Sequence, residues 1–77
     1  MANRPLWAIA REIKREWKNV YFGAQPYLDA MECLHSINDI YDYDTAKSVV
    51  LYFLANAGSW RGDSAKRIKA ELKTLCK

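Results

Sequence analysis

The fold of this chain is decided by its most apolar stretch, which reads TAKSVVLYFLANA at residues 45–57. One face of this stretch carries only apolar side chains at helical spacing, and these are Ala46, Val49, Val50, Phe53 and Ala57. Leu51, Tyr52 and Leu54 widen that face, and Lys47 is the single charge. A helix that is apolar nearly all round is either central in its fold or exposed to a partner. We therefore expect a central helix at about residues 45–57.

Two amphipathic segments precede this central helix. The first predicts a helix that ends at about Lys18, with Asn3 as its cap. Pro5 is tolerated in the opening turn, where backbone donors have no partner within the helix. A second helix is expected to begin at Pro26 and to end near Ser36. Each segment presents one apolar stripe, so both should pack on the central helix.

Residues 38–44 are acidic and rich in turn-forming side chains, so they are expected to form a loop. Either Asp44 or Thr45 is a suitable cap for the central helix. Gly58 suits a left-handed turn at the end of that helix.

The last helix has two possible starts. It begins either with Ser59 as its cap or after Gly62, with Asp63 or Ser64 as its cap. Trp60 is expected to fill the core beneath the joint between the last two helices, where Gly62 would permit close backbone approach. The sequence leaves the two starts open.

These segments define the predicted fold class. No segment alternates apolar and polar residues, and no Asn-Gly dipeptide marks a hairpin, so a sheet is not expected. We predict an all-α fold, a compact single domain over residues 1–77 with four helices, short connections and a central third helix. The expected core residues are Leu6, Ile9, Ile13, Trp17, Leu28, Met31, Leu34, Val49, Val50, Phe53, Leu54, Trp60, Ile68 and Leu72.

The sequence also indicates a cellular location. No long apolar run follows the first positive charge, so a secretory signal peptide is not expected. The longest uncharged run, residues 48–60, is shorter than the roughly 20 residues that span a bilayer. Cys33 and Cys76 lie far apart in the chain, which favours reduced thiols over a disulfide. These features predict a cytoplasmic protein that does not cross a membrane.

Side chains suited to catalysis are few. His35 is the only histidine, and it lies two residues from Cys33. On a helix this spacing turns the two side chains about 200° apart, so they do not form a local pair. We therefore predict no enzymatic activity, no catalytic residue and no cofactor.

Metal binding is not expected either. A calcium loop needs a glycine at its sixth position and a glutamate at its twelfth. Counted from Asp42, these positions hold Lys47 and Phe53. Two distant cysteines and one histidine do not make a zinc site. Asp39, Asp42 and Asp44 are therefore interpreted as turn and capping residues.

Charge is segregated along the chain. Residues 1–18 carry five basic and two acidic side chains, residues 19–46 carry five acidic ones, and residues 47–77 carry seven basic and two acidic ones. A basic face is expected on the first helix, with Trp7 among Arg11, Lys14, Arg15 and Lys18. A second is expected on the last helix at Lys66, Lys69, Lys73 and Lys77. If these helices are neighbours, the faces could merge into one patch that binds phosphates.

Protein binding is indicated by rings that the apolar stripes do not fully use. Tyr, Trp and Arg dominate hot spots between proteins. Such side chains are Trp7, Tyr21, Tyr41, Tyr43, Tyr52, Trp60 and Arg61. We predict that Trp7, Tyr41, Tyr43 and Arg61 contact a partner, together with the basic residues of the first and last helices. The nearly uncharged third helix also leaves a homo-oligomer open.

Six short stretches carry a resemblance to a known class of proteins. They are REI at residues 11–13 with Trp17, PYLDAM at 26–31, SIND at 36–39, YFLANA at 52–57, WRG at 60–62 and IKAEL at 68–72. In these stretches the chain resembles small accessory proteins encoded by tailed bacteriophages. The resemblance implies a protein that acts in the bacterial cytoplasm, where such proteins bind and block host factors, including defence nucleases. It assigns no role to any single residue.

We therefore predict a non-enzymatic accessory binding protein of phage type that engages or inhibits a bacterial host protein. The alternative is a small nucleic-acid-binding protein that uses the basic faces of the first and last helices. The two differ in how they depend on salt, since contacts to phosphates weaken steeply as ionic strength rises.

Overall fold

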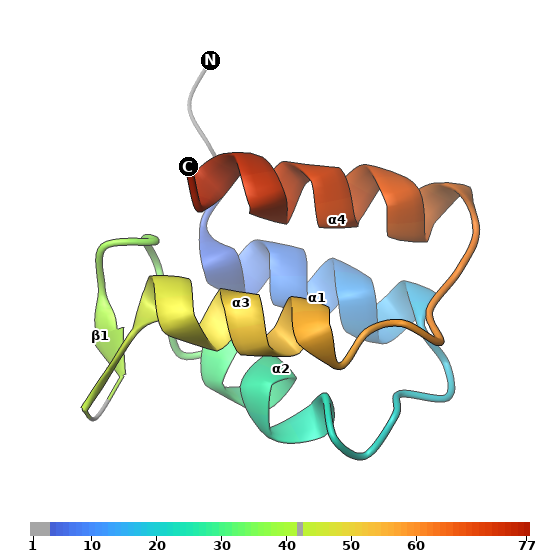
Figure 1. Ribbon diagram of the computed structural model, residues 1–77, viewed down its shortest axis with the longest axis horizontal. Coiled ribbons are helices and arrows are strands. Elements are labelled where there is room, and N and C mark those ends of the chain that lie inside the picture. The colour runs from blue at the N-terminus through green and yellow to red at the C-terminus, as the bar shows by residue number, and fades with distance from the viewer. Residues whose placement is uncertain (1–3, 42) are drawn as a thin grey trace.

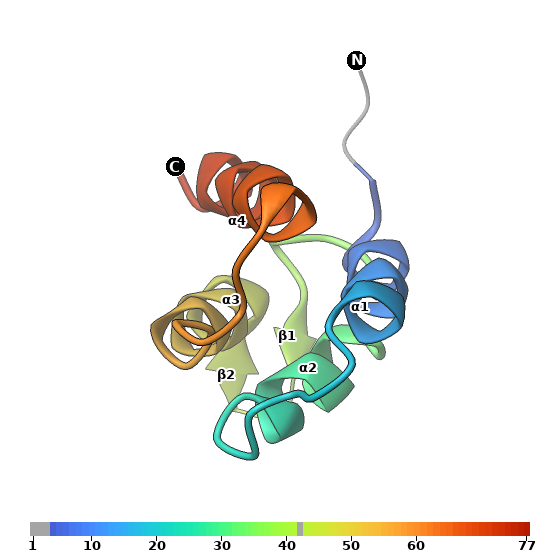
Figure 2. The same cartoon turned by 90° about the vertical axis from the view of Figure 1, so that its right-hand side faces the viewer.

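The computed structural model describes residues 4–41 and 43–77, and it is mostly helical. Its helices are α1 (Leu6–Glu16), α2 (Gln25–Met31), α3 (Ala46–Ala55) and α4 (Asp63–Leu75). The strands β1 (Ile40–Tyr41) and β2 (Asp44–Thr45) precede α3. The four helices surround a common interior, as Figures 1 and 2 show. The predicted helical character and the number of helices are confirmed.

One connected set of buried apolar side chains fills this interior. Every residue that the sequence places in the core is buried except Leu54, which is half-buried at the edge. Trp17, just after α1, stacks on Trp60 with ring centroids 5.6 Å apart, and its edge meets Phe53 at 6.2 Å. Aromatic pairs of this kind add about 1 kcal/mol each to the area they bury. The three rings fasten the end of α1 to α3 and to the joint before α4.

The expectation of no sheet is wrong at residues 40–45. The strands β1 and β2 pair antiparallel, with Ile40 opposite Thr45 and Tyr41 opposite Asp44. The Asp39 carboxylate accepts from the backbone N–H groups of His35 and Ser36, at 2.9 and 3.0 Å. The carbonyl of Asp39 accepts from the N–H of Ala46 at 2.8 Å. These bonds bring the two ends of the loop together, and strands of two residues are too short to show an alternating pattern.

The start of α1 is capped by a distant loop and not by a side chain of its own. The N–H groups of Leu6 and Trp7 donate to the carbonyls of His35 and Leu34, each at 2.9 Å. The expected cap, Asn3, lies outside the described residues. These long-range bonds explain why α2 ends at Met31 and not near Ser36, since the loop after it must turn to offer its carbonyls to α1.

Helices α3 and α4 begin in different ways. Thr45 caps α3 as expected, because its hydroxyl accepts from the N–H of Ser48 at 3.1 Å. Helix α4 has no side-chain cap, so none of the three expected caps acts there. It follows Gly62, whose φ is 113°. Gly62 is thus needed for its backbone conformation, and the expectation of a close backbone approach is wrong because an added Cβ would meet nothing within 4 Å. Gly58 does not adopt the expected left-handed turn.

The central position of the third helix is not confirmed. In Figure 2, α3 occupies one corner of the arrangement, and α1 lies across the interior from it. Its inner side is fully buried, with Phe53 and Val50 at 0% exposure. Its outer side reaches solvent, where Leu51 is 48% and Tyr52 53% exposed. Of the two alternatives for an apolar helix, α3 therefore combines a buried inner face with an exposed outer one.

Candidate protein-interaction surface

The outer side of α3 exposes large apolar side chains to solvent. Residues follow each other by about 100° around a helix, which places Leu51 and Ala55 opposite the buried Val49 and Phe53. Lys47 is the only charge on α3. A soluble helix normally covers its outer side with charged residues, so this one is left without its usual solvation.

The β1–β2 hairpin lies at the N-terminal end of α3 and also exposes apolar side chains. Ile40 is 70% exposed, and the Tyr43 side chain is completely exposed. Thr45 belongs to β2 and also caps α3, so the hairpin is joined to the helix without a linker. Large apolar side chains fixed on such a short, anchored hairpin are more exposed than folding alone requires.

Aromatic rings surround the other end of α3. Tyr27 of α2 stacks on Tyr52 with centroids 5.5 Å apart. Tyr21 packs on Phe22 at 4.8 Å, and the Phe22 ring is 79% exposed. A Cβ at Gly23 would lie 2.6 Å from Cε2 of Tyr21, so this glycine makes room for the ring. We call Ile40, Tyr43, Leu51 and Tyr52 the α3 surface, with the Tyr21–Phe22 pair at its far end.

A group of cations borders the α3 surface. Lys66, Lys69 and Lys73 lie within about 60° of each other on one flank of α4, and Arg61 precedes this helix. Lys69 donates to the carbonyl of Trp60 at 2.6 Å and lies 6.0 Å from that ring. Burial lowers the pKa of Lys69, and the charges of Lys73 and Arg61 lower it further. We call these four cations the basic flank.

The basic flank lies on the side of α4 that faces α3. Lys69 donates to the carbonyl of Trp60, which lies in the connection between α3 and α4. Burial raises the pKa of the Cys76 thiol at the end of α4, and the nearby charge of Lys47 on α3 partly offsets this rise. The opposite flank of α4 faces α1, since Arg67 bonds to Glu12 there. No cation of the basic flank forms an ion pair with any described residue.

The expected basic face of α1 is divided by ion pairs. Lys14 donates to Asp29 at 2.8 Å and also to Glu32, and these bonds raise its pKa. Arg11 lies over the ring of Trp7 at 5.2 Å. Arg15 and Lys18 remain exposed. Only part of this face is therefore available to a ligand.

The two basic faces do not merge along the contact between α1 and α4. Carboxylates occupy that seam: Arg4 bonds to Glu12 and to Glu71, each with a contact of 2.7 Å, and Arg67 bonds to Glu12 at 2.6 Å. These pairs hold the pKa of Glu12 below its usual value and raise that of Arg4. Although the helices are neighbours as the prediction required, the basic flank lies on the far side of α4.

The remaining predicted contact residues are spread over separate places. Tyr41 and Tyr43 lie on the hairpin, where Tyr41 is 37% exposed, and Trp7 has the same exposure on α1. In Figure 2 the outer sides of α1 and α3 point in opposite directions. Trp7 therefore does not share a surface with the tyrosines.

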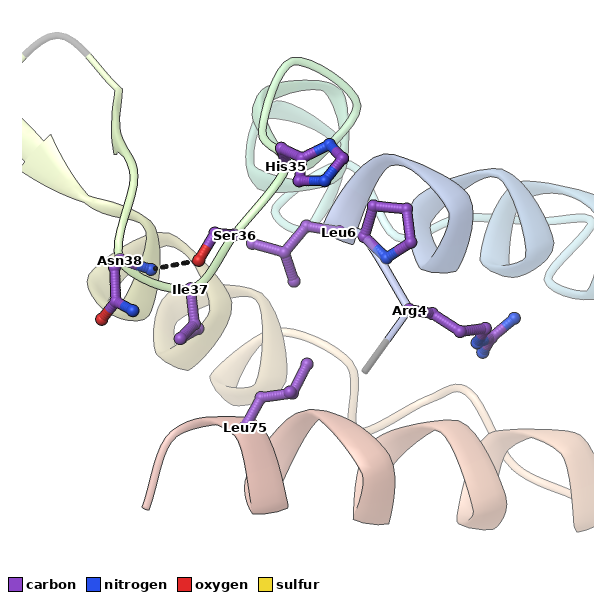
Figure 3. Close-up of a pocket in the computed structure, with 8 residues that line it drawn as sticks. Arg4, Leu6, His35, Ser36, Ile37, Asn38 and Leu75 are labelled. Carbon is purple, nitrogen blue, oxygen red and sulfur yellow. Dashed lines mark hydrogen bonds between the residues drawn. The ribbon is translucent and has the colours of Figure 1, made fainter. Parts of the chain in front are cut away.

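A hollow of about 280 Å³ lies beside the start of α1, and Figure 3 shows the side chains that line it. In this view the Arg4 side chain points away from Ser36 and Asn38, toward its two carboxylate partners. The Ser36 hydroxyl accepts from the N–H of Asn38 at 3.2 Å. The Arg4 guanidinium and the Ser36 hydroxyl are thus engaged within the protein.

Three exposed apolar residues were missed by sequence reasoning as contact residues, namely Phe22, Ile40 and Leu51. Leu51 could have been found, because a helical wheel places it opposite the buried stripe. Ile40 and Phe22 carry no such signal, since their exposure depends on how the loops fold.

No protein-family model, curated protein or solved structure matches this chain. The likeness to phage accessory proteins therefore stays a prediction. None of the helices among the described residues is long and apolar enough to cross a membrane.

Proposed function

We propose that this protein is a non-enzymatic accessory protein of phage type, which acts in the bacterial cytoplasm by binding a host protein through the α3 surface. Binding would block the host protein, and a defence factor is the target class that the resemblance implies. The proposal rests on one observation above all. The outer side of α3 and the adjoining hairpin expose large apolar side chains, from Leu51 at 48% to Tyr43 at full exposure.

Folding leaves these apolar side chains in contact with water, which is energetically unfavourable. Each apolar side chain left in water forgoes about 25 cal/mol for every Å² that a partner would cover. Tyrosines and leucines grouped on one face form the apolar centre of many protein interfaces, and charged residues form their rim. The α3 surface with the basic flank beside it has this composition.

The proposal is tested by affinity capture from lysates of bacteria that tailed phages infect. The wild-type chain is compared with Leu51→Asp, which places a charge at the centre of the α3 surface. Arg15→Asp is the control, because Arg15 is exposed on α1, whose outer side points away from α3 in Figure 2. We expect a stoichiometric protein that the wild type and Arg15→Asp retain and Leu51→Asp loses. Capture of no such protein, or its retention by Leu51→Asp, would overturn the proposal.

A second candidate function is nucleic-acid binding through the basic flank. The observation in its favour is that these four cations form no ion pair among the described residues. A gel-shift assay across a salt series tests it, since log affinity falls by roughly 0.9 per log unit of salt for each phosphate neutralised on duplex DNA. The absence of binding at low salt would exclude this function.

A further inference from the structure

Helices α3 and α4 approach each other where α3 begins and α4 ends, and the basic flank is on the side of α4 that faces α3. Figure 1 shows α3 and α4 running in opposite directions, so that α3 begins where α4 ends. At that end a hollow of about 300 Å³ is lined by Lys47, Cys76 and Lys77, among others. At the other end Lys69 holds the carbonyl of Trp60. We call the outer side of α3 and the basic flank of α4 together the platform, which has an apolar half and a basic half.

Apart from Asp63 at one end, the charged side chains on this platform are positive. Helix α3 carries Lys47 and no carboxylate. On α4, Glu71 is turned toward α1, where it bonds to Arg4. Asp63 lies at the very start of α4, at the end of the platform. No described carboxylate forms an ion pair with the basic flank, so a ligand with negative charge is favoured there.

The apolar half decides which kind of anion fits. A phosphate backbone would neutralise the lysines, but it has no apolar surface with which to cover the exposed side chain of Leu51. A protein segment with acidic residues on one side and apolar residues on the other satisfies both halves at once. Lys66, Lys69 and Lys73 are spaced by three and four residues, which is also the spacing of carboxylates along one face of another helix.

We propose that the platform of α3 and α4 receives an acidic amphipathic helix of the partner protein. Its apolar stripe lies on Leu51 of α3, and its carboxylates pair with Lys66 and Lys73 of the basic flank. This inference rests on the proposed function and adds the chemical character of the partner segment. Helix α3 offers a platform of about 15 Å at 1.5 Å per residue, enough for roughly three turns of such a helix.

The test uses a synthetic probe and not an unidentified partner. The probe is a helical peptide of about 18 residues, long enough to form a helix in water. Leucines follow one stripe of the peptide and glutamates flank it. A matched peptide carries glutamine at every glutamate position. Affinity is measured by fluorescence anisotropy, and the site is mapped by amide chemical shifts of the labelled protein. We expect saturable binding of the acidic peptide and binding about 10-fold weaker for the glutamine peptide.

Charge-reversal variants locate the effect on the protein. Lys66→Glu with Lys73→Glu removes two exposed cations of the basic flank, whereas Lys69 is left in place because it holds the Trp60 carbonyl. Arg15→Glu with Lys18→Glu makes the same change in net charge on the outer side of α1. We expect the first pair to weaken binding about 10-fold and the second pair to change it less than about 2-fold.

Three results would overturn this inference. They are the absence of saturable binding, equal affinity for the acidic and glutamine peptides, and equal loss of affinity in the two charge-reversal pairs. A DNA duplex of about 16 base pairs is tested in parallel, and binding of this duplex alone would assign the flank to phosphates instead. If affinity capture still yields a host protein that depends on Leu51 while the acidic peptide fails, the proposed function stands and only this inference falls.

Discussion

A pair of glycine substitutions tests how the chain turns into α4. Gly62 has φ 113° and ψ 178°, a backbone conformation that only glycine adopts readily. A Cβ at this position would meet no atom within 4 Å, so Gly62→Ala acts through backbone strain alone. We expect a loss of about 2 kcal/mol in the free energy of unfolding. At roughly 4–8 °C per kcal/mol for a domain of this size, the melting temperature should fall by about 10 °C.

Gly58 provides the matched control. It also has open space around an added Cβ, but its φ lies outside the left-handed range. Gly58→Ala should therefore stabilise the protein by about 0.5 kcal/mol, because alanine restricts the unfolded chain. Thermal unfolding followed by circular dichroism at 222 nm compares the two variants. A synthetic chain with D-alanine at position 62 should melt at or above the wild-type temperature, since a D residue favours positive φ. Equal melting temperatures for Gly62→Ala and Gly58→Ala would refute this account of the turn.

Further predictions concern the core, the ion pairs and one aromatic contact. Trp60→Ala should destabilise the protein by about 4 kcal/mol in urea titrations, since Trp60 is 5% exposed and stacked on Trp17. The lowered pKa of Glu12 contributes stability that is fully present above its unfolded pKa and is lost as the pH falls through the folded one. The urea concentration at the midpoint of unfolding should therefore decrease when the pH is lowered below about 4. Glu12→Gln should make this decrease smaller. Gly23→Ala should displace the Tyr21 ring, because the added Cβ would lie 2.6 Å from Cε2 of Tyr21. Nuclear Overhauser contacts between Tyr21 and Asn56 should then be lost.

The sequence could predict the core because helical periodicity records which side chains face inward. Trp17, Phe53 and Trp60 all sit on apolar stripes or at the joint between them, and all three are buried. Leu54 is the exception because it lies at the border of its stripe. An apolar residue at such a border is half-buried or buried depending on the neighbouring helix, which periodicity alone does not specify.

Features that depend on distant parts of the chain could not be predicted. Leu34 and His35 accept the first N–H groups of α1, and no local pattern reveals a cap from about 28 residues away. The hairpin depends in the same way on Asp39, whose carbonyl and carboxylate tie two loop segments together. These bonds shorten α2 and create strands where the sequence shows only turn-forming residues.

The candidate site could be predicted only in part, for a similar reason. A helical wheel shows which residues share a face, but it does not show which cations the fold neutralises. Lys14 and Lys66 look equivalent in sequence, yet Lys14 meets Asp29 and Glu32, whereas Lys66 meets no described carboxylate. Phe22 and Ile40 reach solvent because loops hold them there.

The ion pairs also explain how a net charge of only +3 leaves one strongly basic side. Glu12, Asp29 and Glu32 are bound on the α1 and α2 side of the molecule, where they neutralise Arg4, Arg67 and Lys14. Carboxylates used in this way cannot also screen the cations of the basic flank. A concentrated positive side steers a partner of opposite charge during approach, whereas the apolar residues of α3 act only after contact. The same arrangement that stabilises α1 against its neighbours therefore concentrates the positive field beside the α3 surface.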